Sequence, residues 1–294
     1  MTMPEPGPAP AANLDELLGL ERLDDNLFRG QSRDIGAHRV YGGQVLGQAA
    51  SAAQQTVEPA RLIHSLHAYF LREGDHTAPV IYDVDRSREG RSFASRRVRA
   101  IQHGRPIFTL EASFHRPEPG LEFQLRMPNV PGPDEGQDFF EAVARLDDAG
   151  PTRRIAQMRA IAATFDIRIV KDPGDDNIAI RYGWFRFNEP LREDPFLHRA
   201  ALAYISDFGL LPTVVIPHGY AFPTTDLQMA SLDHAMWFHR DFRVDDWLLY
   251  EMRGINSAGA RGFAAGAFYR RDGALVSSCT QEGLMRPVGP ERSA

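Results

Sequence analysis

The first half of the chain combines two helical segments with a run of strand-like segments. Apolar residues recur at helical spacing over residues 13–23, where Asn13 and Glu16 form a capping box, and again over residues 44–56. Apolar and polar residues then alternate, which predicts strands at 61–71, 80–85, 92–101 and 106–115, separated by the turn sequences REG and QHG. The predicted order is a central helix followed by antiparallel strands.

A connector follows, and then the same order returns. Prolines interrupt residues 117–133, and the connector continues through a helical stretch near 138–144 and a polar patch at 171–176. The later segments predict a strand at 178–187, a helix at about 196–211, and strands near 228–238, 247–256, 261–270 and 274–285.

Local sequence matches support a duplication. RSFASRRV from Arg91 aligns with RGFAAGAF from Arg261, and two turns, His103-Gly104 and Asp272-Gly273, align at almost the same offset. Chance identity between short alanine-rich segments is the alternative explanation. Because offset and element order agree, we expect an N-terminal domain at 13–120, a connector at 121–175 and a C-terminal domain at 176–294. Residues 1–12 are rich in proline and alanine, so we expect them to form a disordered tail.

Composition and charge exclude several classes of protein. A chain of 294 residues with 43% hydrophobic content can bury a full core, and its net charge of -6 argues against a nucleic-acid partner. A single cysteine, Cys279, excludes internal disulfides and a structural zinc site. We see no apolar run approaching the roughly 18 residues of a membrane span, no signal peptide in MTMPEPGPAPAA and no SKL-type ending in ERSA. We therefore expect a cytoplasmic protein without a membrane partner.

The first central helix carries mostly small side chains, and its first turn lacks side chains that would shield the backbone amides. The stretch VYGGQVLGQAASAAQQ has alanines at positions 49, 50, 52 and 53, which would let a sheet approach the helix closely, although alanine is also simply the best helix former. Gly42 and Gly43 leave the first amides of the helix unshielded. This start is either an anion or carbonyl site or only a tight turn.

The second helix ends in a carboxylate. Ala200, Ala203 and Asp207 share one face at helical spacing. A negative charge at a helix C-terminus is opposed by the helix dipole by a few tenths to about 1 kcal/mol, so its position needs a reason. Asp207 is either a solvated or capping residue, or a catalytic one.

Two later strands offer polar partners for this carboxylate. Strand alternation places Ser231 on one face with Trp237 and places His234 on the other face. In the last strand the same rule groups Gln281 with Cys279. Asp207, Ser231 and Gln281 would together suit one water molecule, with the carboxylate accepting its proton and the hydroxyl and amide fixing its lone pairs.

Six motifs in one order carry a resemblance to a known family. FRGQS, VYGGQVLGQA, HSLHAYFLREGD, SLDHAMWFHR, ARGF and TQEGLMR resemble the type II acyl-CoA thioesterase (TesB-like) family, over about residues 14–286. The resemblance implies an α+β double hotdog fold, in which two tandem repeats each wrap a curved antiparallel sheet around a long central helix. It also implies hydrolysis of an acyl-CoA substrate, with no cofactor and no metal.

The resemblance also implies catalytic positions. The aspartate of the family's second-helix motif matches Asp207, and the glutamine of its TQEG-like motif matches Gln281. Ser231 stands where the family typically has threonine, which keeps the hydroxyl but loses the methyl group that restricts its rotamer. The implied mechanism is direct attack by water with Asp207 as general base, without an acyl-enzyme. We expect the oxyanion donors at the free amides near Gly43 and Gln44.

Histidines and arginines add further candidates. His64 and His67 form an HxxH pair, but residues three apart on a strand face opposite sides, which argues against a metal site. His67 is a candidate to line the active site, with a structural role as the alternative. Several arginines are candidates for the phosphates of coenzyme A, although most would be ordinary solvated strand residues: Arg86, Arg88, Arg91, Arg96, Arg97, Arg240 and Arg261.

Competing functions remain open at this stage. The sequence contains no GxSxG, P-loop or HExxH pattern. A hotdog enoyl-CoA hydratase is the enzymatic alternative, and a non-hydrolytic acyl-CoA or fatty-acid binding protein is the alternative from another class. Because curved sheets of this type leave edges and outer faces that usually pair, we also expect a homo-oligomer. Acyl chain length is not predicted.

Overall fold

The computed structural model describes residues 13–37, 39–147, 153–174, 177–220 and 226–288, so the predicted tail at 1–12 lies outside the described residues. The helices are α1 (Leu14–Leu18), α2 (Gly42–Gln54), α3 (Phe139–Asp147), α4 (Arg153–Ala162) and α5 (Pro195–Ser206), with short 3-10 turns η1 (Pro133–Glu135), η2 (Leu211–Val214) and η3 (Ile216–His218). The strands are β1 (Glu21–Asp24), β2 (Leu27–Gly30), β3 (Leu62–Phe70), β4 (Val80–Glu89), β5 (Phe93–Gln102), β6 (Arg105–His115), β7 (Gln137–Asp138), β8 (Phe165–Val170), β9 (Ile180–Phe187), β10 (Leu227–Ser231), β11 (Asp233–Phe238), β12 (Leu248–Ala258), β13 (Arg261–Arg270) and β14 (Leu275–Pro287).

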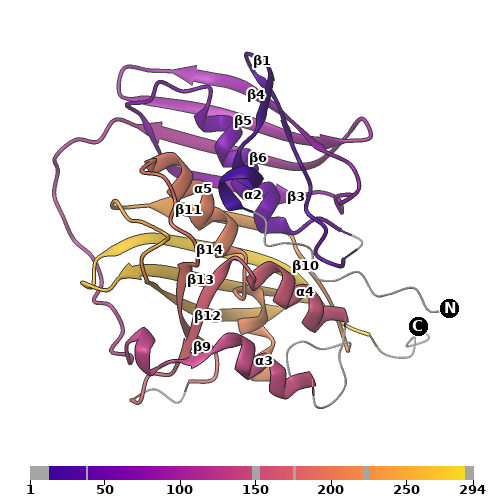
Figure 1. The fold of residues 1–294 in the computed structure, drawn as a ribbon, viewed down its shortest axis with the longest axis vertical. Coiled ribbons are helices and arrows are strands. Elements are labelled where there is room, and N and C mark those ends of the chain that lie inside the picture. The colour runs from indigo at the N-terminus through magenta and orange to yellow at the C-terminus, as the bar shows by residue number, and fades with distance from the viewer. Residues whose placement is uncertain (1–12, 38, 148–152, 175–176, 221–225, 289–294) are drawn as a thin grey trace.

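One antiparallel sheet runs through both halves of the molecule (Figure 1). Its order is β2-β4-β5-β6-β3 in the first half and β11-β14-β13-β12-β9 in the second, and β3 pairs with β11 where the halves meet. Each half therefore has the same order, reversed across the β3–β11 junction. The predicted repeat is confirmed, and the two aligned segments form the equivalent strands β5 and β13. This arrangement is an α+β double hotdog.

The central helices α2 and α5 lie side by side between the two curved halves (Figure 1). A Cβ at Gly43 would lie 2.3 Å from the backbone oxygen of Tyr204, and a Cβ at Gly47 would lie 2.9 Å from that of Ala200. The small residues of α2 therefore serve the close approach of α5, as well as contact with β3, β5 and β6. Only the contact with a sheet was predicted.

Several predicted element bounds are wrong. The helix predicted at 13–23 ends at Leu18, and β1 begins at Glu21. Asn13 caps this helix, because its Oδ1 accepts the Asp15 N–H at 3.0 Å, but no bond between Asn13 and Glu16 completes the predicted capping box in the described structure. The single strand predicted at 228–238 is broken at Leu232. Residues 165–170 of the predicted connector form β8, which pairs with β9 and extends the second half of the sheet. The last two residues of the polar patch at 171–176 lie outside the described residues.

The prediction that no segment approaches a membrane span is wrong for residues Pro195–His218. This segment is long and apolar enough by length and composition, with a mean hydropathy of 1.5 over its most apolar window. However, 78% of that window is buried inside the fold, and the regular α-helix ends at Ser206, before two 3-10 turns. Its apolar character therefore reflects its position as the central helix of the second half.

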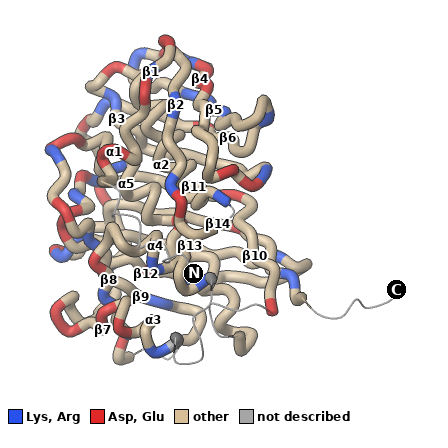
Figure 2. The backbone as a smooth tube through the Cα atoms, turned by 45° about the vertical axis from the view of Figure 1, so that its right-hand side comes forward, with Lys and Arg blue, Asp and Glu red and all other residues tan. Residues whose placement is uncertain are grey.

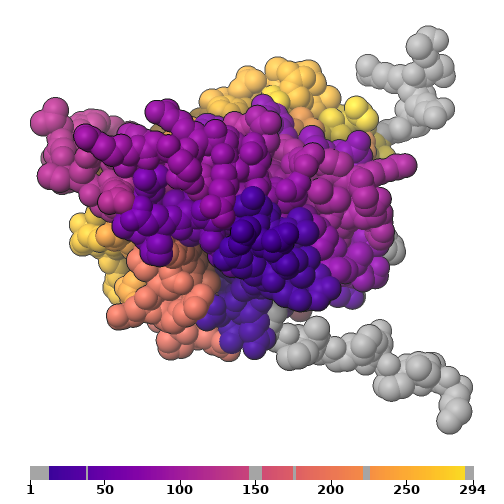
Figure 3. Space-filling view, turned by 90° about the horizontal axis from the view of Figure 1, so that it is seen from above, coloured from indigo at the N-terminus to yellow at the C-terminus, as the bar shows by residue number. Residues whose placement is uncertain are grey.

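The surface carries mixed charge. Basic and acidic residues are interspersed along the backbone in both halves (Figure 2), and many form cross-strand ion pairs, such as Arg97 with Glu111 and Arg261 with Glu282. Seen from above, the strands of the first half cover much of the molecule, with the second half visible behind and below them (Figure 3).

Candidate active site

Asp207 lies where the end of α5 meets the start of α2. Helix α5 begins at a capping Asp194 with Pro195 in its first turn, and Asp207 is its C-cap. Asp207 Oδ2 accepts the Gly43 N–H at 2.9 Å, and Oδ1 accepts a hydrogen bond from Gln281 Nε2 at 2.6 Å. The positive end of the α2 dipole therefore offsets the unfavourable end of α5, which explains why a carboxylate is held at this position.

Gln281 joins Asp207 to Ser231. Its side chain is fully buried on the inner face of β14, and Nε2 donates both to Asp207 Oδ1 and to Ser231 Oγ, the latter at 3.0 Å. An ionised carboxylate can only accept, so the amide nitrogen must face Asp207. Gln281 Oε1 is buried and has no hydrogen-bond partner in the described part of the chain. The structure thus brings the three predicted residues together.

A bulge at Leu232 decides which way Ser231 faces. Ser231 pairs with Gly283 through β10, whereas Ala235 pairs with Thr280 through β11, so three residues of one strand oppose two of β14. Simple alternation is therefore interrupted by one residue. The prediction that Ser231 shares a face with Trp237 and not with His234 is wrong, because the extra residue moves Ser231 to the inner face with Gln281.

The amides predicted as oxyanion donors are already bonded. The Gly43 N–H donates to Asp207 Oδ2, and the Gln44 N–H donates to Tyr41 O at 3.1 Å. The side chain of Gln44 is buried and holds the preceding loop, where it contacts the backbone of Gln31 and Arg33. The expectation of free amides at Gly43 and Gln44 is therefore wrong. The Gly42 N–H, one residue earlier, has no acceptor among the described residues.

His67 does not join this site. It lies on β3 between buried Leu66 and Ala68, but its own side chain is exposed on the outer face, edge-on to Trp237 with ring centroids 5.3 Å apart. The proposal that His67 lines the active site is therefore contradicted by the sheet's alternation. His64 Nε2 instead contacts Ser113 Oγ at 2.8 Å.

Two buried tyrosines, which the sequence analysis missed, fix the end of α5. Tyr41 donates its hydroxyl to Tyr204 O at 3.0 Å, and Tyr250 donates to Ser206 O at 2.7 Å, so both satisfy carbonyls of the last helical turn. Burial raises the pKa of both phenols far above the ordinary value, and the nearby charge of Asp207 adds to the effect. They remain neutral donors that hold the backbone just before Asp207.

His234 supports the same turn from β11 and was also missed as a site residue. Ser206 Oγ gives its proton to Ala203 O at 2.9 Å, so the contact of 2.9 Å between Ser206 Oγ and His234 Nε2 has the imidazole as donor. Burial lowers the pKa of His234 to about 4, although the charge of Asp207 acts in the opposite direction. His234 is therefore neutral at physiological pH. His234 belongs to the SLDH motif that carries the family resemblance, and this position could have identified it as a site residue.

Asp207 and Ser231 line a cavity of about 840 Å³, whereas Gln281 is fully buried and does not line it. Gly42, Asp207 and Ser231 line it, together with apolar residues from both halves and from helices α3 and α4, which belong to the predicted connector. The apolar lining includes Val45, Phe70, Phe108, Phe139, Val143, Met158, Ile161, Phe208 and Leu211. A hydrocarbon chain would thus be removed from water next to a polar, hydrogen-bonded site.

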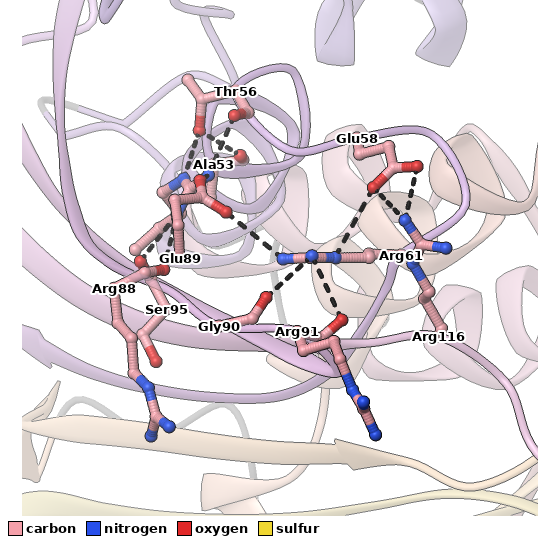
Figure 4. A network of polar contacts seen from close by, with 11 residues as sticks. Ala53, Thr56, Glu58, Arg61, Arg88, Glu89, Gly90, Arg91, Ser95 and Arg116 are labelled. Atoms are coloured by element: carbon pink, nitrogen blue, oxygen red, sulfur yellow. Dashed lines mark hydrogen bonds and ion pairs between the residues drawn. The ribbon is translucent and has the colours of Figure 1, made fainter.

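The arginines predicted to bind phosphate lie elsewhere. None of the seven lines this cavity, and Arg96 is fully buried, where it contacts Thr56 and Glu89 behind the C-terminus of α2. Figure 4 shows the surrounding polar network, in which Glu89 also pairs with Arg61. Arg96 therefore cannot meet a ligand. The arginines that do line the cavity are Arg39, Arg72, Arg154 and Arg181.

Comparisons with known proteins agree with this geometry. Residues 30–115 match the model of the acyl-CoA thioesterase N-terminal domain, and residues 158–284 match that of the acyl-CoA thioesterase family. The chain is 40% identical to acyl-CoA thioesterase 2 of Haemophilus influenzae, over 93% of this chain and 97% of the relative, and 39% identical to human acyl-coenzyme A thioesterase 8, over 98% and 93%.

A solved structure shows the same fold over nearly the whole chain. The acyl-CoA thioesterase II TesB2 from Mycobacterium marinum matches with a TM-score of 0.78 and 39% identity, covering 94% of this chain and 99% of that one. The double hotdog fold, the apolar cavity beside Asp207 and sequence matches that span both halves lead to one conclusion: the chain belongs to the acyl-CoA thioesterase family.

Proposed function

We propose that the protein hydrolyses acyl-CoA to a free fatty acid and coenzyme A by direct attack of a water molecule held by Asp207, Ser231 and Gln281. The observation that carries this proposal is that Gln281 donates hydrogen bonds to both Asp207 and Ser231, and that these two residues lie at the wall of an apolar cavity. A carboxylate and a hydroxyl that accept hydrogen bonds from the same amide nitrogen match the needs of one water nucleophile.

In this mechanism Asp207 accepts a proton from the water as its oxygen attacks the thioester carbonyl. The bond from carbon to sulfur then breaks, and the proton passes to the departing sulfur of coenzyme A. Ser231 Oγ accepts from Gln281, which leaves its own proton available to orient the water. The buried Oε1 of Gln281, which has no partner among the described residues, offers a second acceptor for a hydrogen of this water molecule, close to Asp207. No covalent enzyme intermediate and no cofactor are required.

The Gly42 N–H takes the role of oxyanion donor in this proposal. Gly42 lines the cavity at the start of α2, and a Cβ there would lie 2.8 Å from Asp207 Oδ2. The absence of a side chain thus lets a carbonyl approach the helix terminus next to the base. A single backbone donor of this kind is typically worth about 10²–10³ in rate.

The coenzyme A portion fits the exposed part of the cavity wall. Arg39 and Arg72 are exposed, and Arg154, whose pKa is lowered by burial and by nearby Arg39, lies on α4. Closely placed guanidinium groups favour an anion between them, because each can pair with phosphate oxygens. We assign the phosphates of coenzyme A to this opening, in place of the strand arginines expected from sequence.

Release of thiol from acyl-CoA tests the proposed function. With dodecanoyl-CoA and a thiol-specific chromogenic reagent, the wild-type protein should release free coenzyme A, and Asp207→Asn should reduce kcat by about 10²–10⁴ at an unchanged Tm. An enoyl-CoA hydratase or a passive acyl-CoA binder would release no thiol. A normally folded Asp207→Asn protein with the wild-type rate would remove the base from the mechanism while leaving the fold assignment intact.

A further inference from the structure

Arg181 places a positive charge on the wall of the acyl cavity. Along β9, Tyr182 and Trp184 belong to the apolar cluster on the outer face of the sheet, whereas Phe185 belongs to the main core. Alternation therefore sets Arg181 on the inner face, where it lines the same cavity as Asp207. Its neighbours in that wall are mostly apolar, such as Ile169 on β8 and Phe139 on α3.

The Arg181 guanidinium has no partner among the residues that the structure describes. Arg181 is partly buried, and it makes no hydrogen bond or ion pair with any residue that the structure describes. Burial alone lowers its pKa, without a carboxylate to oppose the effect. The side chain nevertheless remains charged, because arginine does not lose its proton in proteins. An unpaired charge beside an apolar wall costs free energy, and a structural role would normally supply an acceptor.

Arg181 also stands apart from the arginines at the opening. Arg39 and Arg72 are exposed and lie near the start of α2 in the first half, whereas Arg181 lies on β9 of the second half. The phosphates of coenzyme A therefore have other cations to meet. The charge of Arg181 instead falls within the part of the cavity built by α3, β8 and the turn after α5, which is suited to the acyl chain.

We propose that Arg181 binds a carboxylate at the far end of the acyl chain, so that the enzyme prefers the mono-CoA thioesters of dicarboxylic acids. The inference rests on the proposed hydrolysis of acyl-CoA at Asp207. A carboxylate presents two oxygens to the planar guanidinium fork, and this pairing supplies a partner that none of the described residues supplies. The apolar residues between the two ends bind the methylene groups.

The spacing of the strands indicates the length of such a substrate. β14, which carries Gln281, is separated from β9 by β13 and β12. Three inter-strand steps of about 4.8 Å give about 14 Å along the sheet. An extended chain advances about 3.5 Å for every three bonds, so about a dozen bonds span this distance. A twelve-carbon diacid is therefore the appropriate probe.

Steady-state kinetics with two matched substrates test this inference. In the wild-type protein, kcat/KM for the mono-CoA thioester of dodecanedioic acid should exceed that for dodecanoyl-CoA. Arg181→Met should lower kcat/KM for the diacid substrate by about 10- to 100-fold and leave dodecanoyl-CoA unchanged or improved. Arg181→Lys, which keeps the charge but loses the fork, should give an intermediate preference. Arg186→Met, on the same strand but outside the cavity, is the control and should retain the wild-type preference.

Two results would overturn the inference and leave the proposed function standing. The first is hydrolysis of both substrates with the same ratio of kcat/KM in wild type and Arg181→Met. The second is a weakened inhibition constant for free coenzyme A in Arg181→Met, which would assign Arg181 to the phosphates. In contrast, no thiol release from either substrate by the wild-type protein would contradict the proposed function itself.

Discussion

The hydrogen bond of 2.9 Å from the Gly43 N–H to Asp207 Oδ2 joins the start of one central helix to the end of the other. Gly43 belongs to the first repeat and Asp207 to the second, so the site exists only where the two halves meet. The contact requires close approach, and a Cβ at Gly43 would overlap the backbone oxygen of Tyr204. Duplication of the fold therefore supplies a base from one helix and a helix N-terminus from its equivalent.

Gly42→Ala should impair catalysis more than it impairs folding. The added Cβ would lie 2.8 Å from Asp207 Oδ2 and 3.0 Å from the ring of Phe70, so the carboxylate must move. A displacement of about 1 Å in a catalytic group can cost about 10²-fold in rate, and we expect a loss of kcat of that size. Thiol-release kinetics and the Tm of the same preparation provide the measurement.

Gly120→Ala is the matched control for this variant. A Cβ at Gly120 meets nothing within 4 Å, and the residue is exposed, so kcat and Tm should both stay at wild-type values. If Gly42→Ala also retained the wild-type kcat, then neither a displaced carboxylate nor the Gly42 amide would limit the reaction.

Ser231 is expected to act through its hydroxyl group, so that threonine can replace it and alanine cannot. Ser231→Thr keeps the oxygen that accepts from Gln281 Nε2 and adds a methyl that restricts the rotamer, so kcat should remain within about threefold of wild type. Ser231→Ala leaves one amide hydrogen of buried Gln281 without an acceptor, and kcat should fall by about 10- to 100-fold. Equal rates for the alanine and threonine variants would exclude a role for the hydroxyl.

Sequence patterns predicted the repeat because each element obeys a local rule. Helical spacing located α2 and α5, and alternation located most of the long strands. Alternation in β14 also grouped Gln281 with Cys279 on one face, and in the structure both side chains are buried. The same patterns offered Asp207, Ser231 and Gln281 as possible ligands of one water molecule, and the family resemblance matched them to catalytic positions. These features depend on residues close together in the chain, so they can be recognised before any tertiary contact is known.

Features that depend on long-range contacts were predicted poorly. The bulge at Leu232 is fixed by pairing with β14, some 50 residues later, so strand alternation gave the wrong face for Ser231. The free amide at Gly43 was expected from helix geometry, but the acceptor that occupies it comes from α5. Similarly, Arg96 looked like a solvated strand residue until its burial against the end of α2 became visible.

Arg96 should be important for stability, and Arg97 beside it should not. The guanidinium of Arg96 is fully buried and donates to Thr56 Oγ1 and Thr56 O at the C-terminus of α2, to two strand carbonyls and to Glu89, which also pairs with Arg61 (Figure 4). Arg96→Met leaves these acceptors unsatisfied, and the free energy of unfolding should fall by about 3–5 kcal/mol.

Urea unfolding of Arg96→Met and Arg97→Met provides the comparison. Arg97 is exposed and pairs with Glu111 across the sheet, so its loss should cost no more than about 1 kcal/mol. Equal losses in the two variants would contradict a structural role for the buried guanidinium. Because Arg96 lies behind the end of α2 opposite Gly42, thiol release by the folded fraction of Arg96→Met should remain close to wild type.

His234 should make the protein less stable in acid. Its pKa is about 6.5 in the unfolded chain and is lowered by burial to about 4 in the fold, where the charge of Asp207 only partly opposes the effect. Between these two values the unfolded chain binds more protons than the folded one. The free energy of unfolding therefore falls as the pH decreases from about 6.5 to about 4, by about 3 kcal/mol for this group.

The pH dependence of a His234→Gln variant isolates this contribution. A glutamine amide can still donate to Ser206 Oγ but does not titrate, so the variant should lose less stability than wild type between pH 6.5 and pH 4. His64, His198 and His239 also have a lowered pKa and change stability in the same direction in both proteins, so the difference between the two curves reports on His234. Chemical unfolding at several pH values measures it. Parallel curves would show that His234 is already protonated, or never buried, in the folded protein near neutral pH.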